Sequence, residues 1–114
     1  MPEVSAAEAK QIIDSGSQLI DVRTDVEFEA GHIPGARHIP LADVQREAAS
    51  LDQSQPIVIY CRSGNRSGPA ADAFAASDWD AHSIEGGAIA WSEAGLELEP
   101  EGGAVIENPN MPPR

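Results

Sequence analysis

The sequence predicts an α/β fold, a mostly parallel sheet with helices on both faces, because short apolar runs alternate with helical segments along the chain. Parallel neighbours need crossover connections of this kind. The strongest strand signal is the apolar run 57–60, which indicates a central strand buried on both faces. With 114 residues and 41% hydrophobic composition, the chain is expected to form one compact domain.

Two capping boxes define the helices of the N-terminal half. Ser5 with Glu8 predicts a helix over residues 6–15, and Thr24 with Glu27 predicts a short helix that ends before Gly31 and Pro34. The apolar run 19–22 between them predicts a strand.

The remaining elements follow from apolar spacing and from turn residues. Arg37 to Ile39 and Ala81 to Ile84 are interpreted as strands, and three further segments are interpreted as helices, over residues 41–49, 69–76 and 88–94. We expect the domain to span residues 1–98. An acidic, proline-rich tail over 99–114 is expected either to wrap the domain or to stay mobile.

Composition excludes several classes of partner. The chain has 7 basic and 19 acidic residues, a formal charge of −12, so its surface would repel nucleic acid and anionic membranes. No apolar stretch approaches the ~20 residues of a membrane helix, and residues 1–10 do not resemble a secretory signal, which predicts a cytoplasmic protein. The simplest interpretation of the acidic balance is solubility; a salty habitat is an alternative, and if the partner is a protein, the acidic surface favours a basic one.

Cys61, the one cysteine, directly follows the predicted central strand, where open parallel sheets bind their ligands. The loop after it contains two arginines and leads into a helix N-terminus. These features favour a thiolate and predict a lowered pKa for Cys61. The alternative is that Cys61 is a small buried side chain with no chemistry. The three histidines and Cys61 show no zinc-like spacing, so we expect no metal site and no cofactor.

Four ordered blocks of this sequence are similar to those of the rhodanese-like sulfurtransferases. They are Leu19-Ile20-Asp21-Val22-Arg23 with Glu27-Phe28, then Gly31-His32-Ile33-Pro34-Gly35-Ala36, then Ile59-Tyr60-Cys61-Arg62-Ser63-Gly64-Asn65-Arg66-Ser67, and Glu85-Gly86-Gly87 with Trp91. The resemblance implies a five-stranded sheet with an extra strand near Glu3 and Val4, and a persulfide carried on Cys61. Related phosphatases and arsenate reductases have five residues between cysteine and arginine, whereas this loop has four, Arg62 to Asn65. The shorter loop favours sulfur transfer.

The resulting hypothesis is a sulfurtransferase that takes sulfur from thiosulfate or another persulfide donor and passes it to cyanide or a thiol. Without a second cysteine the acceptor must be external, and a protein persulfide partner is a further candidate. Arg62 and Arg66 are candidates for binding the anionic donor or for ordinary ion pairs, within an active-site loop that also contains Ser63, Gly64, Asn65 and Ser67. Structural support is expected from Asp21, Arg23, Gly86 and Gly87. The alternative function is a non-enzymatic interaction or sulfur-sensing module on the same fold.

Overall fold

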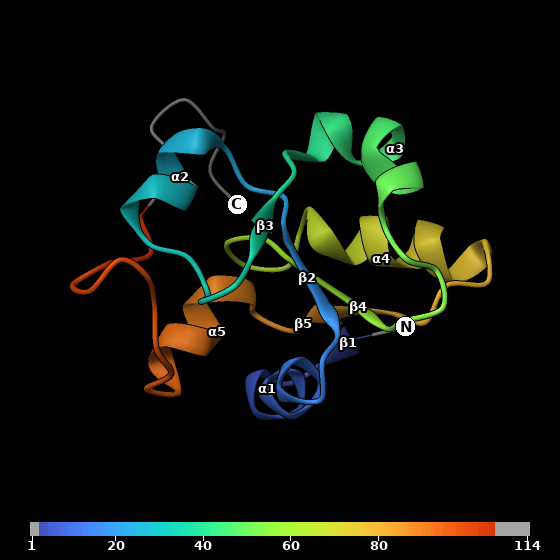
Figure 1. Cartoon of the computed structure of the whole chain (residues 1–114). Coiled ribbons are helices and arrows are strands. Elements are labelled where there is room, and N and C mark those ends of the chain that lie inside the picture. Colours follow the sequence, from blue (N-terminus) through green and yellow to red (C-terminus); the bar gives the residue numbers. More distant parts are fainter. Residues whose placement is uncertain (1–2, 107–114) are drawn as a thin grey trace.

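A five-stranded, entirely parallel sheet forms the centre of the molecule (Figure 1). The structure is a computed structural model that describes residues 3–106. The strand order is β1-β5-β4-β2-β3, with β4 in the middle. The strands are β1 (Glu3–Val4), β2 (Gln18–Asp21), β3 (Arg37–His38), β4 (Ile57–Tyr60) and β5 (Ala81–Ile84). The predicted α/β class is confirmed, and so is the short strand at Glu3 and Val4 that the family resemblance implied.

Helices cover both faces of the sheet. They are α1 (Ala6–Asp14), α2 (Asp25–Ala30), α3 (Val44–Glu47), α4 (Ser67–Ala76) and α5 (Gly87–Glu93). Helices α1 and α5 share one apolar cluster with the sheet, whereas α3 and α4 share the other. Side chains alternate along β4, so Val58 and Tyr60 face the first cluster while Ile59 and Cys61 face the second. Cys61 therefore lies on the α4 side of the sheet.

Both predicted capping boxes begin helices. The Ser5 hydroxyl accepts from the backbone N–H of Glu8 at 3.1 Å, and the backbone N–H of Thr24 donates to the Glu27 carboxylate at 3.2 Å. Most other predicted boundaries lie within one residue of those observed.

Two predicted helices differ from the structure. The segment predicted as one helix over 41–49 is divided into a 3-10 turn η1 (Leu41–Asp43), the single turn α3 and a second 3-10 turn η2 (Ala48–Ser50). Helix α4 begins at Ser67, two residues before the predicted start. Pro69 is tolerated there because the N–H groups of a first helical turn have no partner within the helix.

The described part of the predicted tail lies against α2. His32 and Glu99 exchange two backbone hydrogen bonds of 2.8 and 2.7 Å, and the N–H of Ala104 donates to the carbonyl of Ala30 at 2.9 Å. A Cβ on Gly31 would lie 2.7 Å from the carbonyl oxygen of Ala104, so this contact requires a glycine. Residues 107–114 lie outside the described residues, and the domain limit at residue 98 stays a prediction.

None of the helices within residues 3–106 is both long enough and apolar enough to cross a bilayer.

Candidate active site

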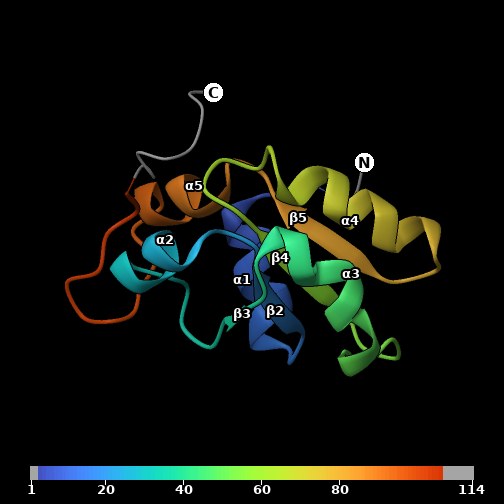
Figure 2. The ribbon, with the colours of Figure 1, turned by 90° about the horizontal axis from the view of Figure 1, so that it is seen from above.

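Cys61 lies at the carboxyl end of the central strand. The loop that it begins runs beside α5 to the start of α4 (Figure 2). Cys61 is completely buried. Its position results from the topology, because the apolar run that forms β4 ends one residue earlier, at the edge of the sheet where parallel strands place their functional loops.

Three donors converge on the sulfur of Cys61. The backbone N–H groups of Gly64 and Arg66 lie 3.0 and 3.4 Å from Sγ, and the hydroxyl of Ser67 lies 3.6 Å from it. Gly64 makes this curvature possible because its φ of 100° lies in the region that glycine favours. The loop thus forms a small cradle whose donors all point at one sulfur atom.

This cradle favours the charged form of Cys61. Burial by itself raises the pKa of the thiol, because it penalises the charge. Hydrogen bonds from the Ser67 hydroxyl and from the backbone N–H groups of the loop outweigh that effect, so the pKa of Cys61 is lowered. The direction agrees with the sequence-based expectation.

We expect the rate of Cys61 alkylation by iodoacetamide to reach its plateau at lower pH in the folded protein than in the unfolded chain. The lowered pKa makes thiolate available below the ordinary cysteine value of ~8.5. The measurement is the alkylation rate against pH, with the urea-unfolded chain as the control because it lacks the cradle. Equal midpoints in the two states would contradict the role of the loop.

Helix α5 holds the first two carbonyl groups of the loop. The N–H groups of Ala88 and Ile89 donate to the carbonyls of Cys61 and Arg62 at 2.8 and 3.0 Å. Gly87 lies so close that a Cβ on it would collide with both of these carbonyl groups. Gly86 precedes the helix with a φ of 76°, in the left-handed region. The predicted glycine pair therefore lies directly against the loop that begins at Cys61.

Arg66 is paired with a buried carboxylate from another element. Its guanidinium makes two hydrogen bonds to Glu27 of α2, at 3.0 and 3.1 Å, and the Glu27 side chain is only 1% exposed. Burial raises the pKa of Glu27, but hydrogen bonds from Arg66 and Thr24 outweigh it and the pKa is lowered. The structure thus favours the ion-pair alternative for Arg66. The sequence analysis identified Glu27 as a helix cap and as part of a family-like block, but not as the partner of Arg66.

Asp21 and Arg23 form a second buried ion pair, on the other side of the sheet from Sγ. Arg23 Nη2 lies 2.6 Å from the Asp21 carboxylate and also donates to the carbonyl of Gly31 at 2.7 Å. The Arg23 guanidinium lies 5.5 Å from the centre of the Tyr60 ring. This pair connects β2 to the end of α2, and none of its hydrogen bonds reaches Cys61.

The remaining loop residues lie nearer the surface. Arg62 and Ser63 are partly buried and Asn65 is exposed. Within residues 3–106, Arg62 makes no ion pair, and its Nε is buried without a hydrogen-bond partner. Of the two loop arginines, Arg62 is therefore the one without an ion pair in the described part of the chain.

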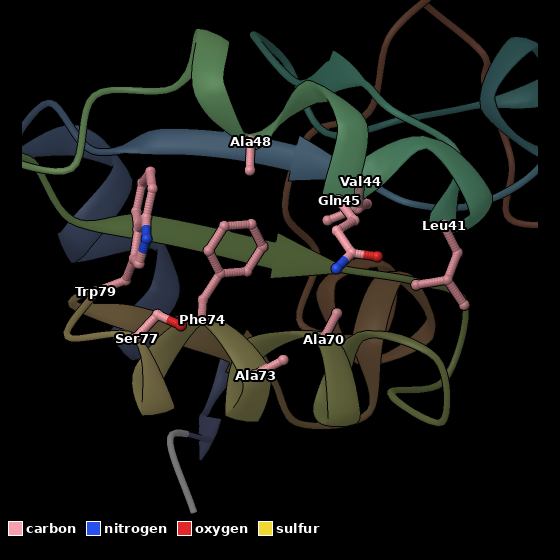
Figure 3. A pocket seen from close by; sticks show the side chains of 9 residues that line it. All are labelled: Leu41, Val44, Gln45, Ala48, Ala70, Ala73, Phe74, Ser77 and Trp79. Carbon is pink, nitrogen blue, oxygen red and sulfur yellow. The ribbon is translucent and has the colours of Figure 1, made fainter.

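An apolar groove of about 410 Å³ lies between α3 and α4 (Figure 3). Phe74 and Trp79 meet edge to face in it, with ring centres 5.0 Å apart. No residue of the 61–67 loop contributes to its lining, so it is separate from the cysteine chemistry. Among the described residues, no group of three or more His, Cys, Asp or Glu side chains is arranged to hold a metal ion.

The fold and the site together define a class of small parallel α/β domains with one cysteine in an amide-lined loop at the end of the central strand. The chain belongs to the rhodanese-like domain family, which it matches over residues 5–94. Its sequence is 35% identical to the thiosulfate sulfurtransferase GlpE of Pseudomonas aeruginosa over 89 residues, which cover 77% of this chain and 81% of GlpE.

Two further relatives agree with this assignment. The putative sulfur carrier protein YrkF of Bacillus subtilis is 45% identical over 73 residues, which cover 62% of this chain and only 40% of that longer protein. The crystal structure of a rhodanese-like domain protein from Staphylococcus aureus superposes with a TM-score of 0.74 at 33% identity, covering 85% of this chain and 97% of that one. Two of these relatives thus have names that refer to sulfur, GlpE to sulfur transfer and YrkF to sulfur carriage.

Proposed function

We propose that this protein is a sulfurtransferase that carries a sulfane sulfur on Cys61 as a persulfide. The observation that carries the proposal is the convergence of the Gly64 and Arg66 N–H groups and the Ser67 hydroxyl on Sγ, at 3.0, 3.4 and 3.6 Å. Such donors stabilise the negative charge on Sγ, so they favour the thiolate that attacks the sulfur donor and that is restored when the persulfide is unloaded. The family and its sulfurtransferase relatives support the same chemistry.

The first half-reaction loads the cysteine. The thiolate of Cys61 attacks the outer sulfur of thiosulfate, a sulfur–sulfur bond to Cys61 forms, and the bond to the sulfonate group breaks. Sulfite leaves with the electron pair of the broken bond, and the negative charge moves to the terminal sulfur of the persulfide. No outside oxidant or reductant is required.

The second half-reaction unloads the cysteine onto an external acceptor. Cyanide or an acceptor thiolate attacks the terminal sulfur, which leaves as thiocyanate or as a new persulfide, and the Cys61 thiolate is restored. Because the chain has one cysteine, no internal thiol can resolve the persulfide. Two-step kinetics of the ping-pong type follow from this order.

Arg62 is proposed to attract the anionic donor and to open its path. Cys61 has no exposed surface, so a donor sulfur can reach Sγ only when a neighbouring side chain moves. Of the two loop arginines, Arg62 is the one without an ion pair within residues 3–106, and its positive charge opposes the repulsive field of a chain with a formal charge of −12. Because the chain is acidic, an acceptor protein is expected to present a basic surface to it.

We expect the intact mass to rise by one sulfur atom after incubation with thiosulfate and to return to its starting value with cyanide. The Cys61→Ser variant should show no gain, because serine cannot form a persulfide. Thermal unfolding of the variant, compared with wild type, checks that its fold is intact.

Other outcomes separate the alternatives. No sulfur gain by the wild-type protein, with thiosulfate or with a protein persulfide as the donor, would contradict the proposal and favour a non-enzymatic interaction module. A gain in the Cys61→Ser variant would place the modification at another residue.

A further inference from the structure

Ser83, on β5, is a buried hydroxyl that the proposed transfer does not use. It pairs in register with Ile59 of β4 and is completely buried beside an apolar cluster. A buried hydroxyl is costly unless it has a hydrogen-bond partner. Its partner is the hydroxyl of Ser67, 2.8 Å away, which is also completely buried.

Ser67 connects Ser83 to the nucleophile. Its oxygen lies 2.8 Å from that of Ser83 and 3.6 Å from Sγ of Cys61, so the three side chains form a chain from β5 to the sulfur. We propose that Ser83 is a positioning residue for Cys61, holding the Ser67 hydroxyl in the orientation in which it donates to a negatively charged sulfur. The inference rests on the proposed function in that Cys61 is the reacting group.

The proton count of the two hydroxyls fixes the direction of this chain. A hydroxyl has one proton to donate, and a negatively charged sulfur can only accept. When Cys61 is charged, the proton of Ser67 must point to Sγ, so the bond between the serines requires the proton of Ser83. When the sulfur is a neutral thiol, both hydrogen bonds can reverse without any movement of the oxygens.

Ser83 also fixes the side on which the hydroxyl of Ser67, the first residue of α4, lies. The partner on β5 holds Ser67 Oγ on the side of the helix that faces the sheet and the sulfur. With alanine at position 83, the Ser67 hydroxyl would lose both this partner and the polarisation that strengthens its bond to sulfur.

The test is the pH titration of the Cys61 thiolate by its ultraviolet absorbance. The signal belongs to one residue, because Cys61 is the only cysteine and burial raises the pKa of the only tyrosine, Tyr60. We expect Ser83→Ala to raise the apparent pKa of Cys61 by about half a unit, a roughly threefold loss of thiolate below the midpoint, since one charge-assisted hydrogen bond is weakened while the backbone donors remain.

Charged groups around the loop stay constant in this comparison. Arg62 and Arg66 of the loop, and Glu27, which α2 pairs with Arg66, are unaltered by the substitution. Ser17→Ala is the matched control, because it removes the hydroxyl of a different serine, one that has no hydrogen-bond partner in the described structure. This variant should leave the pKa of the Cys61 thiol unchanged.

A double-mutant cycle shows whether Ser83 acts through Ser67. In a Ser67→Ala background, Ser83→Ala should cause no further shift, because the connecting hydroxyl is gone. An unchanged pKa in folded Ser83→Ala, or the same shift in both backgrounds, would overturn the proposal.

A second pair of variants covers the case in which Ser83→Ala does not fold. Threonine and valine have nearly the same shape and both suit a strand, but only threonine has a hydroxyl. Ser83→Thr should keep the wild-type thiolate pKa and Ser83→Val should raise it. Equal titrations would overturn the proposal. The titration needs no sulfur donor, so its outcome is independent of the mass test of persulfide formation.

Discussion

Replacing Glu27 with glutamine is expected to lower the free energy of unfolding by about 3 kcal/mol, because it leaves the guanidinium of Arg66 buried without its carboxylate. The Arg66 side chain is only 13% exposed, so water cannot replace the lost partner. The backbone N–H of Arg66 also donates to Sγ of Cys61, so a displaced Arg66 should also raise the pKa of the thiol. Urea unfolding measures the first effect and the pH dependence of alkylation the second.

The exposed pair Lys10–Asp14 provides the control. Its side chains are 46% and 61% exposed, so Asp14→Asn should change stability little.

The acid limb, which is the fall in the free energy of unfolding at low pH, gives a second check. Because the pKa of Glu27 is lowered, its contribution is complete above the ordinary glutamate value of ~4.3 and is lost as the pH falls through the lower folded-state value. Glu27→Gln should therefore flatten that limb, and a variant as stable as wild type would show that the ion pair contributes nothing.

Local signals in the sequence predict most of the fold. The run 57–60 and the box at Ser5 and Glu8 depend on neighbours within a few residues, so the sequence contains the information that defines them. The segment 41–49 was predicted wrongly as one helix. Over a single turn, apolar spacing does not distinguish an α-helix, with 3.6 residues per turn, from a 3-10 helix, with three residues per turn. Pro69 predicts where the first turn of α4 lies, but it does not show that the helix begins two residues earlier, at Ser67.

The candidate site depends on contacts between distant segments, which the sequence shows less directly. The position of Cys61 at the end of a strand could be predicted, since strand, loop and helix are consecutive. The partner of Arg66 is 39 residues away and the partner of Ser67 is 16 residues away, and neither spacing carries a local signal. Gly31 illustrates the same limit, because the need for glycine comes from the close approach of Ala104.

Gly87→Ala is expected to cause the largest combined loss of stability and of sulfur loading. Gly87 has a φ of 57°, in the left-handed region that costs an alanine about 1 to 2 kcal/mol. Its new Cβ would also collide with the carbonyl groups of Cys61 and Arg62. Hydrogen bonds from Ala88 and Ile89 hold these carbonyls in place, so relief of the collision must displace the loop that points its donors at Sγ.

Gly95→Ala is the control that separates the cost of the left-handed backbone from the cost of the collision. Gly95 has a φ of 78°, but a Cβ there would meet nothing within 4 Å, so this variant isolates the backbone cost. The Gly87 variant should therefore lose about 1 to 3 kcal/mol more in urea unfolding, the usual cost of overpacking. It should also gain less sulfur from thiosulfate, whereas the Gly95 variant loads like wild type. Equal stability and equal loading would mean that the loop tolerates the added carbon, and that the close approach of α5 does not position Cys61.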